Sequence, residues 1–338
     1  YRQLKKERDD SRKGGIPYSH MALAIEDVGS SQAHILKRGN PRLQGDPVEP
    51  DFPEALRHSA PYGPPLEKGQ NKIKRRIVAE WIASPENPMT ARVMVNRIWQ
   101  HHFGRGIVRS SNDFGKFGTQ ATHSKLLDWL AHEFVSNQWR IKSLHKTIMM
   151  SNTYQMSAQA NEEALVVDPL NDLFWRFDIR RLTAEEIRDS VLSVSGNLNE
   201  KLGGPSVFPE LPEEVLSTSS QPTRVWGKSP PEEANRRSVY VKVKRSLLVP
   251  ILNQFDMANT DSTCAVRFMT MVPTQSLTML NGKFINQQAV AFAERIRQQG
   301  GSDLTDQIQF GLRLVLSRQP SIEEIAWATE FVETLTKK

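Results

Sequence analysis

From about residue 70 onward, apolar residues recur at the three- and four-residue spacing of α-helices. The clearest stripe follows Thr90 and consists of Val95, Ile98, Trp99, His102 and Phe103. Residues at these spacings share one helical face, and an apolar face packs against a core. The pattern predicts a mainly α-helical fold, a compact multi-helix domain with a few short β-strands.

Hydroxyl residues that can accept hydrogen bonds from first-turn amides precede several stripes, namely Thr90, Ser124, Thr183 and Ser321. A glutamate follows Thr183 and Ser321 three residues later, as Glu186 and Glu324, which is the spacing of a capping box. Further helices are expected at 143–156, 285–296 and 303–317.

Alternating patterns predict the strands. Met21, Leu23 and Ile25 alternate with small or charged residues, and residues 33–36 follow a Gly-Ser turn. Residues 238–245 (SVYVKVKR) alternate most regularly and form the strongest strand prediction, because successive side chains of a strand point to opposite faces.

The composition of the chain predicts its domain organisation. Residues 1–66 are expected to be an N-terminal extension or linker with short strands, irregular from 39 onward, and residues 67–338 the helical domain. Residues 203–235 are rich in Pro, Ser, Gly and Glu. They predict a long loop, which is the best candidate for a binding segment.

The bulk composition excludes several classes of protein. Of 338 residues, 38% are hydrophobic, yet no stretch approaches the roughly 20 apolar residues of a membrane span. A single cysteine, Cys264, excludes an internal disulfide, a cysteine zinc site and covalent haem attachment. Because the chain starts with Tyr1 and not Met, we expect it to be a piece of a longer protein.

The net charge is +6, and one basic cluster stands out at Lys72, Lys74, Arg75 and Arg76. We interpret it as a solvated helix face, with an anion or nucleic-acid patch as the alternative. Because the chain has no zinc finger and no aromatic-rich sheet motif, no nucleic-acid partner is predicted.

Two adjacent histidines end the stripe that follows Thr90. His102 shares the apolar face and is expected in the core, whereas His101 points about 100° away and can face a cleft. A metal at His101 would need further ligands, and His123, Asp113 or Asp128 could supply them. Because the spacing matches no metal signature, no metal site is predicted; contact with a haem of another domain stays open.

Other candidate residues combine charge with turn-forming sequence. Asp113 begins a Gly-rich turn (DFGKFG) and either caps nearby amides or acts as a catalytic carboxylate. Glu185 and Arg188 lie in a dense charged run with Arg181 and Asp189, which predicts an ion-pair network or an acid–base site. The Arg residues of this run could also hold an anionic sugar or sulfate.

Asp256 follows Phe255, and beyond it a polar loop leads to Cys264 and Arg267. All histidines precede residue 146, so a base for Cys264 would have to come from the fold, and we expect a buried inert thiol.

Many short motifs occur together in a fixed order. They are Asn87-Pro88-x-Thr90-Ala91-Arg92-Val93, Asn96-Arg97-x-Trp99, His102-Phe103-Gly104-Arg105-Gly106, Asp113-Phe114-Gly115, His123-x-x-Leu126-Leu127-Asp128-Trp129, Arg180-Arg181-Leu182, Glu185-x-Ile187-Arg188-Asp189, Arg237-Ser238-x-Tyr240, Phe255-Asp256 and Gln275-x-Leu277-x-x-Leu280-Asn281. In these motifs the chain, from about 70 to 333, resembles the C-terminal domain of unknown function of large planctomycete proteins that often carry a cytochrome-c-like domain upstream.

The resemblance implies a secreted or periplasmic multidomain protein. It implies no cofactor in this chain, but a haem in a separate domain, and it carries over no catalytic residues. The favoured hypothesis is therefore an accessory domain that packs on a cytochrome-like or other partner domain of the same polypeptide, or binds a glycan such as an anionic one.

The alternative hypothesis is a hydrolase or oxidoreductase domain that acts on carbohydrate. Its site would be built from His101, Asp113, Glu185, Arg188 and Asp256. The sequence leaves open whether the chain is an enzyme, because it contains no nucleophile elbow, phosphate-binding loop or dinucleotide fingerprint.

Overall fold

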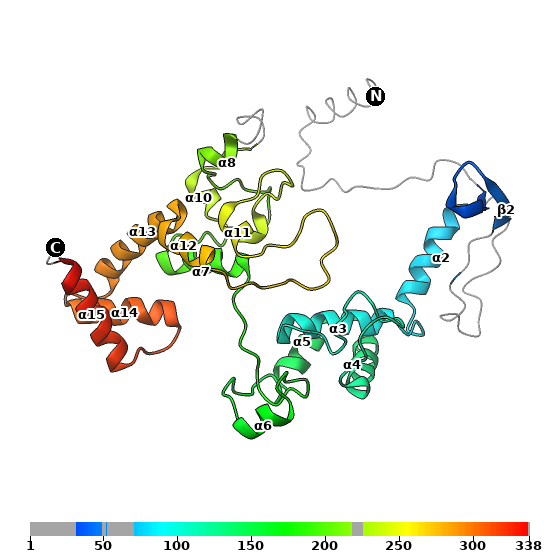
Figure 1. Cartoon of the computed structure of the whole chain (residues 1–338), viewed down its shortest axis with the longest axis horizontal. Coiled ribbons are helices and arrows are strands. Elements are labelled where there is room, and N and C mark those ends of the chain that lie inside the picture. Colours follow the sequence, from blue (N-terminus) through cyan, green and yellow to red (C-terminus); the bar gives the residue numbers. More distant parts are fainter. Residues whose placement is uncertain (1–31, 49–51, 53–70, 218–225, 337–338) are drawn as a thin grey trace. The chain divides into compact units, whose positions relative to one another are not determined.

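The computed structural model describes residues 32–48, 52, 71–217 and 226–336 (Figure 1). By its internal contacts the chain divides into two compact units, residues 1–180 (unit 1) and 181–338 (unit 2), and each is described by itself. The strand expected at 21–25 lies outside the described residues. The part that is described is mainly α-helical, as the sequence predicts.

A small hairpin begins the described part of unit 1. Strand β1 (Ala33–Leu36) pairs antiparallel with β2 (Gln44–Val48), and a 3-10 turn, η2 (Lys37–Gly39), follows β1. The strand at 33–36 is therefore confirmed, whereas the irregular course expected for the segment from residue 39 is wrong at 44–48. Pro47 lacks an amide hydrogen, and a two-stranded ribbon tolerates it because each strand is an edge.

The helices of unit 1 follow the predicted stripes. They are α2 (Asn71–Ala83), α3 (Thr90–Phe103), α4 (Ser124–Ser136), α5 (Ile141–Met149) and α6 (Glu162–Val167). Helix α2 ends before Pro85, and α3 ends at Gly104, whose φ of 78° is left-handed and favours glycine. Helix α5 is shorter than the predicted 143–156.

Neither Thr90 nor Ser124 caps its helix, so both cap predictions are wrong. Each hydroxyl residue is already the first helical residue. The start of α3 is capped by the side chain of Asn87 instead. Its Oδ1 accepts hydrogen bonds from the amides of Met89 at 3.0 Å and Thr90 at 3.2 Å. An amide side chain serves as well as a hydroxyl, because both provide an acceptor oxygen for free first-turn amides.

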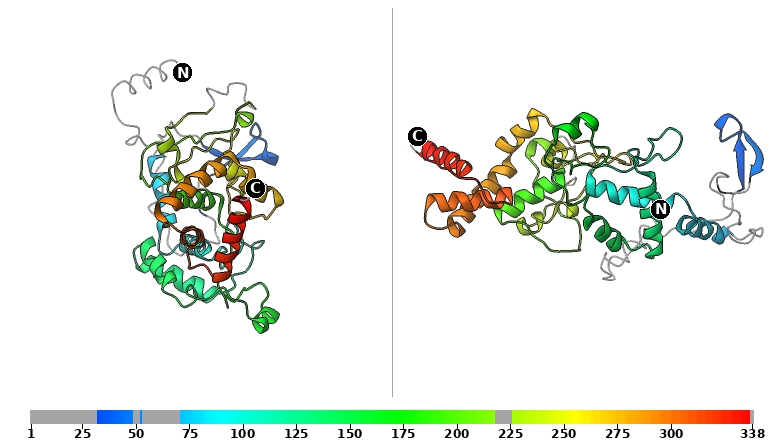
Figure 2. Two further views of the ribbon diagram at one scale, coloured as in Figure 1. Left: turned by 90° about the vertical axis from the view of Figure 1, so that its left-hand side faces the viewer. Right: turned by 90° about the horizontal axis from the view of Figure 1, so that it is seen from below.

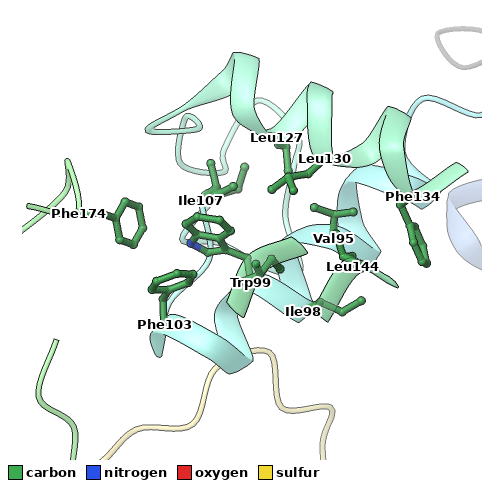
Figure 3. Packing of buried hydrophobic residues seen from close by; sticks show 12 residues of the cluster. Val95, Ile98, Trp99, Phe103, Ile107, Leu127, Leu130, Phe134, Leu144 and Phe174 are labelled. Carbon is green, nitrogen blue, oxygen red and sulfur yellow. The ribbon is translucent and has the colours of Figure 1, made fainter. Parts of the chain in front are cut away.

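The core of unit 1 is aromatic and aliphatic. Helices α3, α4 and α5 contribute Val95, Ile98, Trp99, Phe103, Leu127, Leu130, Phe134, Leu144 and Ile148. The rings of Trp99 and Phe103 stack with centroids 4.2 Å apart, and Phe174 meets Trp99 edge-on at 5.4 Å (Figure 3). The stripe after Thr90 is thereby confirmed, except that His102 is only half-buried.

Unit 2 combines long helices with several short ones. Its helices are α7 (Ala184–Ser195), α8 (Glu213–Ser217), α10 (Pro231–Ala234), the 3-10 turn η4 (Ser238–Tyr240), α11 (Pro250–Gln254), α12 (Pro273–Asn281), α13 (Lys283–Gln299), α14 (Leu304–Leu316) and α15 (Ile322–Thr336). Helix α13 packs on both α7 and α14, and α14 packs on α15 (Figures 1 and 2). Helix α12 has no counterpart among the predicted helices.

Both predicted capping boxes of unit 2 are confirmed. Thr183 accepts from the amide of Glu186, whose carboxylate accepts from the Thr183 amide at 2.8 Å. The Ser321 amide donates to Glu324 at 2.8 Å, and the Glu324 amide donates to the Ser321 hydroxyl at 3.2 Å. A hydrogen bond from Arg318 lowers the pKa of Glu324 to about 2, aided by the bond from the Ser321 amide.

The buried face of α7 is not the predicted one. Ile187, Val191 and Val194 are only half-buried. The fully buried positions are Ala184, Arg188, Leu192 and Ser195. A charged side chain thus lies at the centre of the buried stripe, which hydrophobic periodicity alone does not reveal.

The strand predicted at 238–245 is wrong. Residues 238–240 form the turn η4, and only single bridges follow, Val207 to Val241 and Lys244 to Leu247. The carboxylate of Asp189 accepts hydrogen bonds from the amide and the hydroxyl of Ser238, both at 2.7 Å. These bonds hold residue 238 in a turn, where a strand would need hydrogen bonds to a neighbouring strand.

The segment predicted as a long loop at 203–235 contains the short helices α8 and α10, while residues 218–225 lie outside the described part. Among the helices that the structure describes, none has the length and apolar character needed to cross a membrane.

Candidate functional site

The two histidines at the end of α3 have different surroundings. His102 Nε2 lies 2.7 Å from Nδ1 of His145 on α5, and the ring of Tyr154 meets His102 edge-on. Burial lowers the pKa of His102, and the neighbouring His145 and His101 lower it further. The pair therefore favours a neutral His102 that shares one hydrogen bond with His145.

His101 is exposed on α3, as its position on the helix predicts. Within the described residues, no three His, Cys, Asp or Glu side chains gather in a way that could hold a metal ion. The ligand partners considered for His101 are used otherwise: Asp128 binds Arg92 at 2.6 Å, and His123 Nδ1 contacts the hydroxyl of Thr122.

Asp113 lies in an exposed turn of unit 1. Its Oδ1 accepts from the Gly115 amide at 2.8 Å, and its carbonyl accepts from the Ser110 hydroxyl at 2.6 Å. A Cβ on Gly118 would collide with the Asp113 carbonyl, which explains the glycine there. These contacts agree with the interpretation of Asp113 as a turn residue.

In unit 2 the structure brings Glu185 and Asp256 together around one cation. Arg267 donates to both carboxylate oxygens of Glu185, at 2.7 and 3.2 Å. The same guanidinium donates to the backbone carbonyl of Asp256 at 3.3 Å. A bidentate pair of this geometry is among the stronger ionic contacts in proteins.

The carboxylate of Asp256 is surrounded by donors. It accepts from Arg181 at 2.6 Å, from the Thr270 amide at 2.8 Å and from the Thr270 hydroxyl at 3.0 Å. Asp256 itself has a left-handed φ of 61°, which aspartate tolerates better than most residues. Residue 256 and residue 270 are thereby joined, and the intervening chain forms a loop closed at its base.

Arg188 lies apart from that pair and is 1% exposed. It donates to the carbonyls of Ala234 at 2.7 Å and Arg236 at 3.0 Å, and to the Ser238 hydroxyl at 3.2 Å. Burial lowers its pKa to about 10, which Asp189 partly opposes, so the side chain remains a cation at neutral pH.

A second arginine, Arg236, is buried although it is not among the predicted site residues. Arg236 is fully buried, donates to the carbonyls of Lys201, Gly203 and Pro205, and has its guanidinium 3.8 Å from the Tyr240 ring centroid. Arg237 and Ser238, the residues that follow Arg236, belong to one of the quoted motifs. They are charged and polar, so no apolar periodicity at this point of the sequence indicates that Arg236 is buried.

The prediction of a buried Cys264 is wrong. The thiol is exposed, with Sγ 3.4 Å from the Val266 carbonyl. The preceding residues Met257–Thr263 form a loop rather than a helix or strand, so no packed face covers the side chain.

The five candidate residues therefore fall into four places, two in each unit. His101 and Asp113 lie in unit 1 on an exposed helix face and an exposed turn. Glu185 and Asp256 share Arg267 in unit 2, and Arg188 lies in the buried layer beneath Ser238. Arg188, Asp256 and Arg267 each bond the backbone of another segment, and Glu185 holds Arg267, which is an arrangement that can fix loops.

The fold is that of a mainly α-helical protein of two units. In unit 2, buried arginines donate hydrogen bonds to the carbonyls of irregular backbone segments. Residues 74–332, 259 of the 338, match the family PSD1, described as protein of unknown function (DUF1553). The chain belongs to this family. No curated protein and no solved structure matches the chain.

Proposed function

We propose that this chain is a non-catalytic accessory domain of a secreted or periplasmic multidomain protein. What supports the proposal is the state of the charged groups in unit 2. Both oxygens of Glu185 accept from Arg267, and Asp256 accepts from Arg181 and Thr270. General acid–base catalysis needs a group within reach of a substrate proton, whereas these groups are engaged in holding loops.

The resemblance to planctomycete proteins with an upstream cytochrome-c-like domain suggests the partner. In this proposal the chain packs on that domain of the same polypeptide, and any haem belongs to the partner. An anionic glycan is the other ligand class, since arginine forks bind sulfate and carboxylate groups. His101, exposed on α3, is the side chain that could approach a haem of the partner.

The first experiment separates structural from chemical roles. Glu185→Gln is compared with Glu333→Gln, an exposed glutamate on α15, in the full-length protein. We expect Glu185→Gln to lower Tm, since it removes one charge of a bidentate pair, and to leave partner binding and any turnover per folded molecule unchanged. Lost turnover at an unchanged Tm would instead place Glu185 in an active site.

The second experiment addresses the partner. The absorption spectrum of the haem domain is recorded in the full-length protein with His101→Ala and, as a matched control, His132→Ala on α4. A shift confined to His101→Ala would place this face of α3 against the haem. Identical spectra in both variants would remove His101 from the interface.

A further inference from the structure

An exposed apolar surface runs from the end of the loop before α12 along α12 itself. Seven large apolar side chains here are each more than a third exposed: Phe268, Met269, Met271, Val272, Leu277, Met279 and Leu280. Phe268 and Met271 are 84% exposed and Leu280 is 70% exposed. We call this set the α12 surface. Seven such residues within thirteen positions of the chain are a concentration of exposed apolar side chains, and such a concentration marks an interaction site more than scattered single residues do.

The α12 surface carries no charge. Residues 268–282 contain no Asp, Glu, Lys or Arg, although 24% of the chain is charged and fifteen residues would carry about 15 × 0.24 = 3.6. The charged residues at its borders are both paired, Arg267 with Glu185 and Lys283 with Glu210. A segment exposed to solvent is normally rich in charged residues. The lack of charged residues therefore distinguishes the α12 surface from an ordinary solvated segment.

The backbone that displays these side chains is fixed. Thr270 is held by Asp256, and the buried Gln275 donates to the Gln254 carbonyl at 3.2 Å and to the Thr270 hydroxyl at 3.3 Å. A surface already held in place loses little conformational entropy when it is covered. Methionine side chains add adaptability, since they fill irregular gaps in an interface.

We propose that the α12 surface is the two-fold interface through which a second copy of this chain binds. At a two-fold axis the same patch faces itself, so any charge near the axis meets a like charge. An uncharged patch satisfies this requirement. A different protein partner is usually selected by complementary charges, and the α12 surface has none to offer.

The composition of the surface suits such a contact. Its fifteen residues, 268–282, are fewer than the about 20–30 on each side of a standard interface, so a dimer would bury neighbouring residues of unit 2 as well. Apolar side chains flanked by Thr, Ser, Gln and Asn also match the composition of homodimer interfaces, which are more apolar than other contacts. The proposal concerns self-association and is independent of the accessory role proposed above.

The test is the mass of the 338-residue chain by sedimentation velocity and light scattering over the micromolar range. We expect a dimer of 2 × 38.4 = 76.8 kDa. The double variant Met271→Glu, Leu280→Glu is expected to sediment at 38.4 kDa, because two buried carboxylates would face their copies across the axis. Met150→Glu, at a residue of unit 1 that is 68% exposed, is the matched control and should remain dimeric.

A measurement on the unchanged chain guards against a misfolded variant. Amide exchange at residues 268–281 should slow as the concentration of the chain rises. A wild-type mass of 38.4 kDa at every concentration would overturn the proposal. So would a dimer that survives the double variant, or slow exchange that is independent of concentration, which would mean that another part of the same chain covers the surface.

Discussion

Both units have an apolar core, but they differ in the largest side chains that they bury completely. In unit 1 the core consists of apolar and aromatic residues from three helices, with Trp99 and Phe103 stacked at its centre. In unit 2 the two largest fully buried side chains are Arg188 and Arg236. The reason lies in the backbone: long helices pair their own amides and carbonyls, whereas the short segments around α7 leave carbonyls that need donors from elsewhere.

The comparison shows how irregular backbone can be buried. Arg188 and Arg236 together donate to five backbone carbonyls, those of Ala234, Arg236, Lys201, Gly203 and Pro205. A guanidinium has five N–H donors in a planar fork, so one side chain can satisfy several carbonyls at once. Unit 2 thus adds directional contacts to its own apolar core, whereas unit 1 relies mainly on apolar packing, so their responses to substitution differ.

The largest effect is expected from Trp99→Ala in unit 1. Removal of a large buried aromatic side chain leaves a cavity and should cost about 3–5 kcal/mol in the free energy of unfolding. Urea denaturation followed by circular dichroism measures this loss. Trp99→Phe is the control, because the indole N–H finds no acceptor among the described residues. If Trp99→Phe were as damaging as Trp99→Ala, filled volume would not be what stabilises unit 1.

Arg188→Met should come next and should act on unit 2. The substitution keeps an extended apolar stem but leaves the carbonyls of Ala234 and Arg236 without this donor, at about 1–3 kcal/mol for each unsatisfied group. Amide exchange measured by residue should accelerate around α7 and η4 and stay unchanged in α3. An unfolding free energy equal to that of the wild type would show that the arginine is replaceable by apolar packing.

Asp256→Asn tests the loop closure and should have a smaller effect. Asparagine also tolerates the left-handed backbone of residue 256, so the change removes mainly the charge that Arg181 meets. We expect a loss of about 1.5 kcal/mol, the low end of the range for a hydrogen bond to a charged group, and faster proteolysis within residues 257–269. Asp261→Asn, in an exposed ion pair of the same loop, should leave both properties unchanged.

The smallest effect is a dependence on pH in unit 1. The folded-state pKa of His102 is lowered by burial and by His145, so the unfolded chain binds the proton first as the pH falls. Its contribution to stability is complete above the unfolded pKa of about 6.5 and decreases as the pH falls toward the folded value. His102→Gln should flatten the slope of Tm against pH below 6.5. An unchanged slope would mean that His102 is not the titrating group.

Local sequence patterns could predict helices because the information is contained within each helix. The stripe of Val95, Ile98 and Trp99 and the capping box of Thr183 and Glu186 were found in this way. Pattern reasoning failed where a distant partner decides the conformation. Residues 238–245 alternate like a strand, but Asp189 holds Ser238 in a turn.

The candidate site shows the same limit. The four-residue spacing of Glu185 and Asp189 already shows that they are close on one helix. Glu185 and Arg267, by contrast, are 82 positions apart, so their contact depends on the tertiary fold. Arg188 was chosen for its charge, yet nothing in its neighbours indicated that it would be buried. Exposure of Cys264 likewise follows from the path of a loop, which composition does not specify.

The helical class, most helix positions and two capping boxes follow from the amino-acid sequence alone, because they depend on contacts within about four residues. Which charges are buried, and what they hold, depends on tertiary contacts. A buried arginine is stable only when several acceptors converge on it, and for Arg188 those acceptors come from residues 46 to 50 positions away.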